Sequence, residues 1–122
     1  MSYDKNNIFA KIMRGEIPCG KVYEDAHVFA FHDIAKVAPV HVLVVPKGDY
    51  ISFDDFAANA PAEEVKNFFA TVQKIAATLG VDKTGYRLVT NHGADASQSV
   101  AHFHMHILGG RNLGGWDEVV KK

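Results

Sequence analysis

The longest amphipathic pattern lies in the middle of the chain, between Pro61 and Leu79. Apolar residues recur there in steps of three and four, the spacing that places side chains on one face of an α-helix. Pro61 suits a first helical turn, and Gly80 ends the pattern. We therefore predict one long helix over this stretch. Its apolar stripe consists of Val65, Phe68, Phe69, Val72, Ile75, Ala76 and Leu79.

Shorter apolar patterns predict one short helix, a helical turn and five strands. Residues 8–14 place three apolar side chains on one helical face, and residues 52–57 suggest a short helical turn. Runs rich in β-branched and aromatic residues, bounded by turn residues, indicate the strands. The predicted strands cover residues 21–24, 28–32, 41–46, 86–90 and 100–108. The run 41–46 is apolar on both faces, which favours a central position in the sheet.

The order of these elements predicts an α+β fold, with a five-stranded, mainly antiparallel sheet that carries one long and one short helix. No repeat or Pro/Gly-rich linker divides the 122 residues, so we expect a single domain. An open sheet leaves two exposed edge strands, and an edge strand invites pairing with another chain. We therefore expect the protein to form a homodimer.

Composition narrows the classes of function. The chain is 48% apolar and 22% charged, which is typical of a soluble globular protein. Its net charge of −1 provides no long-range attraction to nucleic acid or to anionic membranes. The single cysteine, Cys19, excludes an intrachain disulfide and fits a reducing compartment. With neither a signal peptide nor a membrane-spanning stretch in the sequence, we expect a cytoplasmic protein.

The candidate chemistry lies near the C-terminus, where histidines alternate with large apolar residues. The run reads His102, Phe103, His104, Met105, His106, Ile107 and Leu108. Alternation has the period of a β-strand, so the three imidazoles are expected on one face. Burying three imidazoles is costly unless each has a hydrogen-bond partner. A structural role, a zinc site and a nucleophilic histidine are the alternatives.

Two of these alternatives make use of imidazole chemistry. Histidines at i and i+2 can ligate one zinc ion, but the outer pair of the run lie about 13 Å apart along an extended strand. A complete zinc site would therefore need His41 or a carboxylate. In the nucleophilic alternative His104 attacks phosphorus while its neighbours bind phosphate oxygens or protonate a leaving group. The preceding loop supplies Asn91, Gln98 and Ser99 as polar donors, so we prefer a site without zinc.

Eight stretches match a known family in the same order along the chain. The histidine run fits the motif His-x-His-x-His-x-x with apolar x. The other stretches are residues 8–12, 16–18, 30–34, 38–41, 85–87, 98–100 and 108–111. The chain resembles the histidine triad nucleotide-binding (Hint) branch of the HIT superfamily. The resemblance covers residues 7–111 as a HIT domain and leaves residues 112–122 as a C-terminal tail.

This resemblance implies a HIT-like fold, a homodimer whose two sheets join, and a site for a purine nucleotide such as AMP or GMP. It implies hydrolysis of nucleoside phosphoramidates or acyl-nucleotides, with His104 as the nucleophile and a nucleotidyl-histidine intermediate. His106 would contact the phosphate and assist proton transfer. His102 and His41 would form a shared hydrogen-bond network that orients the nucleophile. No cofactor would be required.

The resemblance also implies the residues of a nucleotide pocket. Asp33 matches the residue that accepts hydrogen bonds from the ribose hydroxyls, and its alternative role is to cap a turn. Positions near the base and ribose are Ile8, Phe9, Phe31, His32, Ile34 and Leu43. Phosphate contacts are expected from the loop residues Asn91, Ser97, Gln98 and Ser99. Ser97 stands where relatives often carry glycine, and Trp116 lies one residue later than the tryptophan of the Hint branch.

Two other functions fit the same residues. One is hydrolysis of dinucleoside polyphosphates, as in the fragile-histidine branch of the superfamily. The Leu108-Gly109-Gly110 sequence after the histidines favours the Hint branch instead. The other is a nucleotide-binding or scaffold protein whose catalysis is incidental, because a complete site does not disclose the cellular task.

Overall fold

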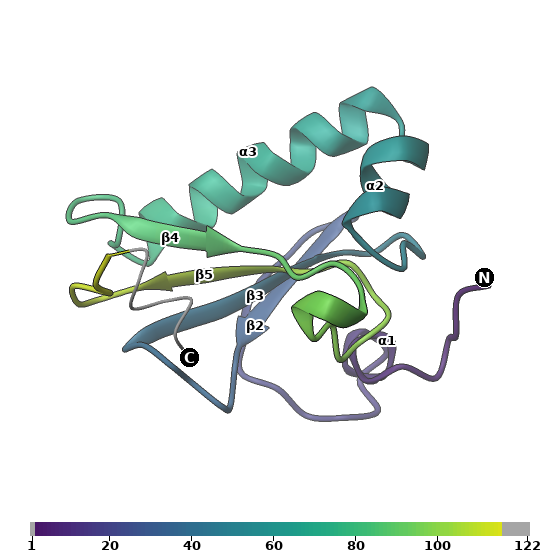
Figure 1. Cartoon of the computed structure of the whole chain (residues 1–122), viewed down its shortest axis with the longest axis horizontal. Helices are drawn as coiled ribbons and strands as arrows, with labels where there is room; N and C mark the ends of the chain where they lie inside the picture. The colour runs from purple at the N-terminus through teal and green to yellow at the C-terminus, as the bar shows by residue number, and fades with distance from the viewer. Residues whose placement is uncertain (1, 116–122) are drawn as a thin grey trace.

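The computed structural model describes residues 2–115 and has a five-stranded sheet at its centre (Figure 1). Its strands lie in the order β1-β2-β3-β5-β4, and every neighbouring pair is antiparallel. The elements are α1 (Ile8–Met13), β1 (Lys21–Glu24), β2 (Val28–His32), β3 (Val40–Pro46), α2 (Phe53–Asn59), α3 (Ala62–Thr78), β4 (Tyr86–Val89), the 3-10 turn η1 (Ala94–Ala96) and β5 (Met105–Gly109). The predicted α+β fold and the central position of β3 are confirmed. Over residues 2–115, no helix has the length and apolar character that a membrane span requires.

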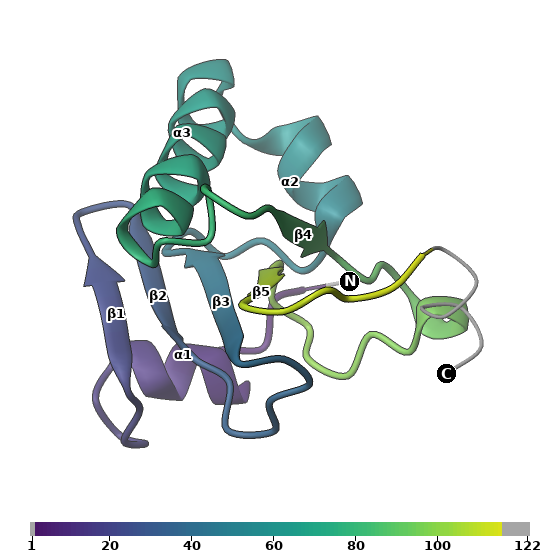
Figure 2. The ribbon, with the colours of Figure 1, turned by 90° about the vertical axis from the view of Figure 1, so that its left-hand side faces the viewer.

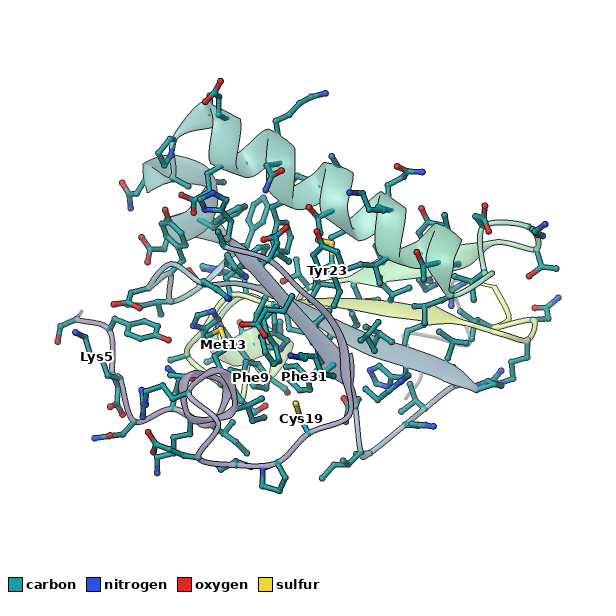
Figure 3. All side chains as sticks on the ribbon, turned by 180° about the vertical axis from the view of Figure 1, so that it is seen from behind. Lys5, Phe9, Met13, Cys19, Tyr23 and Phe31 are labelled. Atoms are coloured by element: carbon teal, nitrogen blue, oxygen red, sulfur yellow. The ribbon has the colours of Figure 1, made fainter. Side chains whose placement is uncertain are left out.

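Helices cover both faces of the sheet, as Figure 2 shows. The long helix α3 packs on one face, where Phe68, Val72 and Ile75 meet the apolar side chains of β2, β3 and β5. The short helix α1 lies against the other face. There Phe9 meets Phe31 of β2 with ring centroids 5.6 Å apart (Figure 3). The sheet therefore separates a large core from a smaller one.

The structure has more helix than the sequence predicted. In place of one long and one short helix, residues 2–115 contain three α-helices, because the expected turn at residues 52–57 is the complete helix α2. The Ser52 hydroxyl caps this helix by accepting a hydrogen bond from the Asp55 amide. The apolar stripe of α3 is narrower than predicted: Phe68 is 1% exposed, whereas Phe69 is 40% exposed at its margin.

The histidine strand is shorter than predicted. Residues 100–108 were expected to form one strand, but β5 begins only at Met105. The backbone groups just before β5 form hydrogen bonds outside the β-sheet. The Phe103 amide donates to the carbonyl of Tyr50 (2.7 Å), and the His104 carbonyl accepts from the Thr90 hydroxyl (2.8 Å). The alternation of side chains still holds. Phe103, Met105 and Ile107 belong to the core beneath α3, while the histidines point to the α1 side.

Candidate active site

Burial and hydrogen bonding hold His104 as a neutral imidazole and assign its proton to one ring nitrogen. Its side chain is 7% exposed, and its ring meets the ring of Phe9 edge-on at 4.8 Å. Nδ1 lies 2.7 Å from the carbonyl oxygen of His102, which can only accept, so the proton sits on Nδ1. Burial lowers the pKa of His104, which keeps the ring neutral. Nε2 is thereby left with a free lone pair, as a nucleophile requires.

His41 and His106 form a hydrogen-bonded pair, in which the partners of each ring decide which nitrogen carries its proton. The amide of Val37 donates to Nδ1 of His41 (3.2 Å), so the proton of His41 sits on Nε2. That nitrogen lies 2.9 Å from Nδ1 of His106, which leaves the proton of His106 on its own Nε2. Burial, together with the neighbouring histidines, lowers the pKa of His106 to about 4. The ring of His106, with its centroid 5.2 Å from that of His104, thus carries an N–H donor beside the nucleophile.

Asp33 lies beside the His41–His106 pair. Its Oδ2 is 3.3 Å from Nε2 of His41, and its Oδ1 accepts a hydrogen bond from the Ala35 amide (2.8 Å). The second contact caps the turn, which is the alternative to ribose binding that the sequence offers for Asp33. One oxygen of the carboxylate is therefore engaged by the loop, while the other faces the histidines.

His102 supports the site from within the core. Its side chain is fully buried, Nε2 donates to the carbonyl of Pro46 (2.8 Å), and Nδ1 accepts from the hydroxyl of Tyr3. Burial lowers the pKa of His102 to about 4. The expected network shared by His102 and His41 is therefore corrected. His102 orients His104 through its backbone carbonyl, and the side chain of His41 bonds to His106 instead.

The six positions predicted to lie near the base and ribose fall into three groups. Phe9, Phe31 and Leu43 are buried in the smaller core, on the face that carries the histidines. Ile34, directly after Asp33, is 99% exposed, and Ile8 of α1 is 47% exposed. His32 alternates with Phe31 and pairs with Val42, so its side chain lies on the opposite face of the sheet from the histidine cluster.

Gln98, one of the residues predicted to contact phosphate, stabilises the loop between β4 and β5. The side-chain oxygen of Gln98 accepts from the Gly93 amide (2.9 Å), and its nitrogen donates to the carbonyls of Ile51 (2.9 Å) and Val100 (3.0 Å). The side chain of Gln98 thus fixes the shape of the loop, and its expected role as a phosphate contact stays a prediction. Asn91 is half-buried at the start of the loop, and Ser99 is exposed near its end.

Ser97 has a left-handed backbone, with φ of 59° and ψ of 41°. Within residues 2–115 it is the only non-glycine residue with positive φ. Glycine adopts this conformation without the steric cost that a β-carbon imposes. This is a physical reason for glycine at the matching position of relatives. Trp116 lies outside the described residues.

One group of described residues has the composition of a metal ligand set. Asp33, His41 and His106 offer ligand atoms within 4.8 Å of one another. If Nε2 of His41 bound a metal ion, its proton would move to Nδ1 and face the Val37 amide, which is also a donor. Metal-binding histidines instead donate their second N–H to an acceptor. These residues therefore fit a hydrogen-bonded chain better than a zinc site.

Sequence reasoning missed two residues of the site. Tyr3 bonds to His102 across 99 positions of the chain, and Thr90 holds the carbonyl of His104. Neither carries a signal in the sequence, since a tyrosine near a terminus and a threonine after a strand are common. Only the fold brings them to the histidines.

Comparison with known proteins gives consistent matches. The model of the HIT domain family matches residues 14–113. An uncharacterized HIT-like protein of Azospirillum brasilense is 50% identical over 113 residues, which is 93% of each chain. The structure of a HIT family hydrolase from Clostridium thermocellum superposes with a TM-score of 0.85 at 38% identity, covering 92% of this chain and 96% of that one. A histidine triad nucleotide-binding protein from Candida albicans has a TM-score of 0.75 at 29% identity, covering 95% and 91%.

Proposed function

Because the chain belongs to the HIT domain family, we propose that it is a purine nucleoside phosphoramidate hydrolase of the Hint type, with His104 as the nucleophile. The observation that carries this proposal is the hydrogen bond from Nδ1 of His104 to the carbonyl of His102. It leaves the lone pair on Nε2, and the lowered pKa of His104 keeps that lone pair free of protons. Imidazole in this state is a good nucleophile for phosphorus.

The reaction proceeds in two steps. In the first, Nε2 of His104 forms a bond to the α-phosphorus, the P–N bond breaks, and the amine leaves with a proton from solvent. In the second, water attacks the nucleotidyl-histidine, its oxygen forms the new P–O bond, and its proton returns to solvent. Nε2 of His104 departs with its lone pair, and a nucleoside monophosphate is released. The Nε2–H of His106 donates to phosphate oxygens throughout, so charge is stabilised without a metal ion.

The substrate class and assembly belong to the same proposal. The similarity to a HIT family hydrolase and to a histidine triad nucleotide-binding protein supports a nucleotide as the substrate. We place the ribose hydroxyls at Asp33 and the phosphate beside Asn91 and Ser99. The enzyme acts as a cytoplasmic homodimer whose sheets join at an edge strand.

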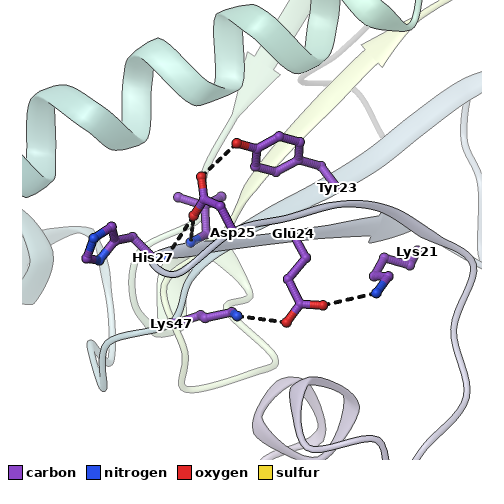
Figure 4. A network of polar contacts seen from close by, with 7 residues as sticks. Lys21, Tyr23, Glu24, Asp25, His27 and Lys47 are labelled. Atoms are coloured by element: carbon purple, nitrogen blue, oxygen red, sulfur yellow. Dashed lines mark hydrogen bonds and ion pairs between the residues drawn. The ribbon is translucent and has the colours of Figure 1, made fainter.

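The decisive experiment is the release of AMP from an adenosine phosphoramidate by the His104→Ala variant. We expect no measurable release from a variant whose far-UV circular dichroism matches that of the parent. His27→Ala is the matched control, since His27 lies exposed at the β1–β2 turn (Figure 4). Undiminished turnover by His104→Ala would rule out the proposed nucleophile.

Two further measurements separate the alternatives. A dinucleoside polyphosphate hydrolase would turn over diadenosine triphosphate faster than the phosphoramidate, and we expect the reverse. Turnover of the phosphoramidate should also survive dialysis against a chelator, because His104 and His106 supply the chemistry without zinc. Activity that disappears on chelation and returns with zinc would contradict this.

A further inference from the structure

The N-terminal segment reaches the histidine cluster through a single side chain. The hydroxyl of Tyr3 donates to Nδ1 of His102 at 2.5 Å, and the two rings meet edge-on with centroids 5.4 Å apart. The segment itself is held in place beside α1. The backbone carbonyl of Asp4 accepts from the backbone and side-chain amides of Asn7, and Asn7 in turn caps α1. Tyr3 therefore approaches His102 from a folded segment.

His102 depends on this contact because it is fully buried. Its ring has two nitrogens, and each has one partner: the Pro46 carbonyl at Nε2 and the Tyr3 hydroxyl at Nδ1. A buried acceptor that loses its only donor costs free energy comparable to a lost hydrogen bond or more. The ring would then shift to find another partner. Its own carbonyl, which receives the Nδ1–H of His104, would shift with it.

We infer that Tyr3 is a positioning residue of the active site, whose hydroxyl holds His102 neutral and fixed so that its carbonyl orients His104. The inference rests on the proposed function for its kinetic consequences, but not for the state of His102. Tyr3 contacts His102, and its effect on the nucleophile passes through that residue.

Removal of the Tyr3 hydroxyl exposes His102 to protonation. Tyr3 lines a cleft of about 340 Å³ that also borders Lys5, Arg14 and Asp49, so water has a route toward the freed Nδ1. The titratable groups that act on His102 are His104 on its own segment and Asp49 after β3, while Asp49, Arg14 and Asp4 act on Tyr3. Asp49 favours the protonated ring and His104 opposes it. With Nδ1 free to bind a proton, the pKa of His102 rises.

The test is Tyr3→Phe, which removes the hydroxyl and keeps the ring. We expect titration of His102, followed by imidazole NMR on the folded protein, to move upward by at least one pH unit. With the phosphoramidate substrate, kcat should fall about tenfold at pH 7 with little change in KM. The acid limb of the kcat profile should also move to higher pH, which simple loss of stability does not produce.

Tyr23→Phe is the matched control. Its hydroxyl donates to Oδ2 of Asp25 (2.7 Å) in the β1–β2 hairpin (Figure 4) and does not bond to His102. It loses one hydrogen-bonded hydroxyl, as Tyr3→Phe does, but should leave the titration of His102 and the pH profile unchanged. An unchanged titration of His102 in Tyr3→Phe, or the same displacement in Tyr23→Phe, overturns the inference. If the parent protein lacks turnover, the proposed function fails, and the NMR titration still tests the role of Tyr3.

Discussion

Nε2 of His41 lies 2.9 Å from Nδ1 of His106, and this contact sets which nitrogen of His106 can donate a hydrogen bond to a ligand. His41 itself is fixed by the Val37 amide at its other nitrogen. The backbone of one loop therefore determines the proton position on a ring that belongs to another strand. The nucleophile His104 is oriented by a separate backbone carbonyl, so the two functional histidines have independent supports.

His41→Phe should remove the directional support of His106 while it preserves a buried ring. We expect His106 to become a mixture of tautomers in nitrogen-15 NMR spectra and kcat to fall about tenfold, because one charge-stabilising donor is no longer fixed. His92→Phe is the control, since His92 is exposed and faces Asp54 outside the cluster. A single Nε2–H tautomer of His106 in His41→Phe would show that its support comes from elsewhere.

Asp33→Asn separates two roles of this carboxylate. The variant keeps an oxygen for the Ala35 amide but loses the charge and the second acceptor. If Asp33 binds the ribose diol, KM for a ribonucleotide substrate should rise about tenfold with kcat nearly constant. For the parent, KM should rise by a similar factor when the substrate is the 2′-deoxynucleotide. For the variant, the same change of substrate should leave KM almost unchanged. A fall in kcat alone would instead place the effect on His41, 3.3 Å away.

Stability should fall as the pH drops from about 6.5 to about 4. In the unfolded chain histidine takes up a proton near pH 6.5, whereas burial lowers the pKa of His102 to about 4 in the folded protein. The unfolded state therefore binds more protons in this window, and acid favours it. The loss from His102 alone is about 3 kcal/mol over the full window.

Urea unfolding at pH 7, 6 and 5 measures this dependence. His102→Gln is the comparison, because its amide still offers a donor to the Pro46 carbonyl but does not titrate. The free energy of unfolding of this variant should depend less on pH than that of the parent. Equal slopes in the two proteins would show that His102 is not the group responsible.

Ser97→Gly should stabilise the loop between β4 and β5. The left-handed backbone of Ser97 suits glycine, so we expect the free energy of unfolding to rise by about 1 kcal/mol. Ser99→Gly in the same loop is the control, because Ser99 does not have positive φ. In Ser99→Gly the added conformational freedom of the unfolded chain should lower the free energy of unfolding by about 0.5 kcal/mol. Thermal or urea unfolding compares them, and equal effects would refute the conformational argument.

The elements were predicted best where the pattern is local. The bounds of β1 and β2 agree with the structure, and α3 differs from its predicted range by one residue at each end. The extent of β5 was predicted less well, because strand pairing depends on partners elsewhere in the chain. Tyr50 and Thr90 bind the backbone of Phe103 and His104, so the ladder starts at Met105.

The sequence by itself determined the alternation of histidines with Phe103, Met105 and Ile107, and with it the choice of one sheet face for the chemistry. Side-chain direction along an extended chain has a period of two, so this needs no knowledge of the fold. Only the tertiary structure decided which nitrogen of each ring carries the proton. For His102 and His106 that choice depends on partners distant in sequence, namely Tyr3 for His102 and His41 for His106, whereas His104 is set by the nearby carbonyl of His102. Hydrogen-bond direction is a property of contacts, and these contacts exist only after the chain has folded.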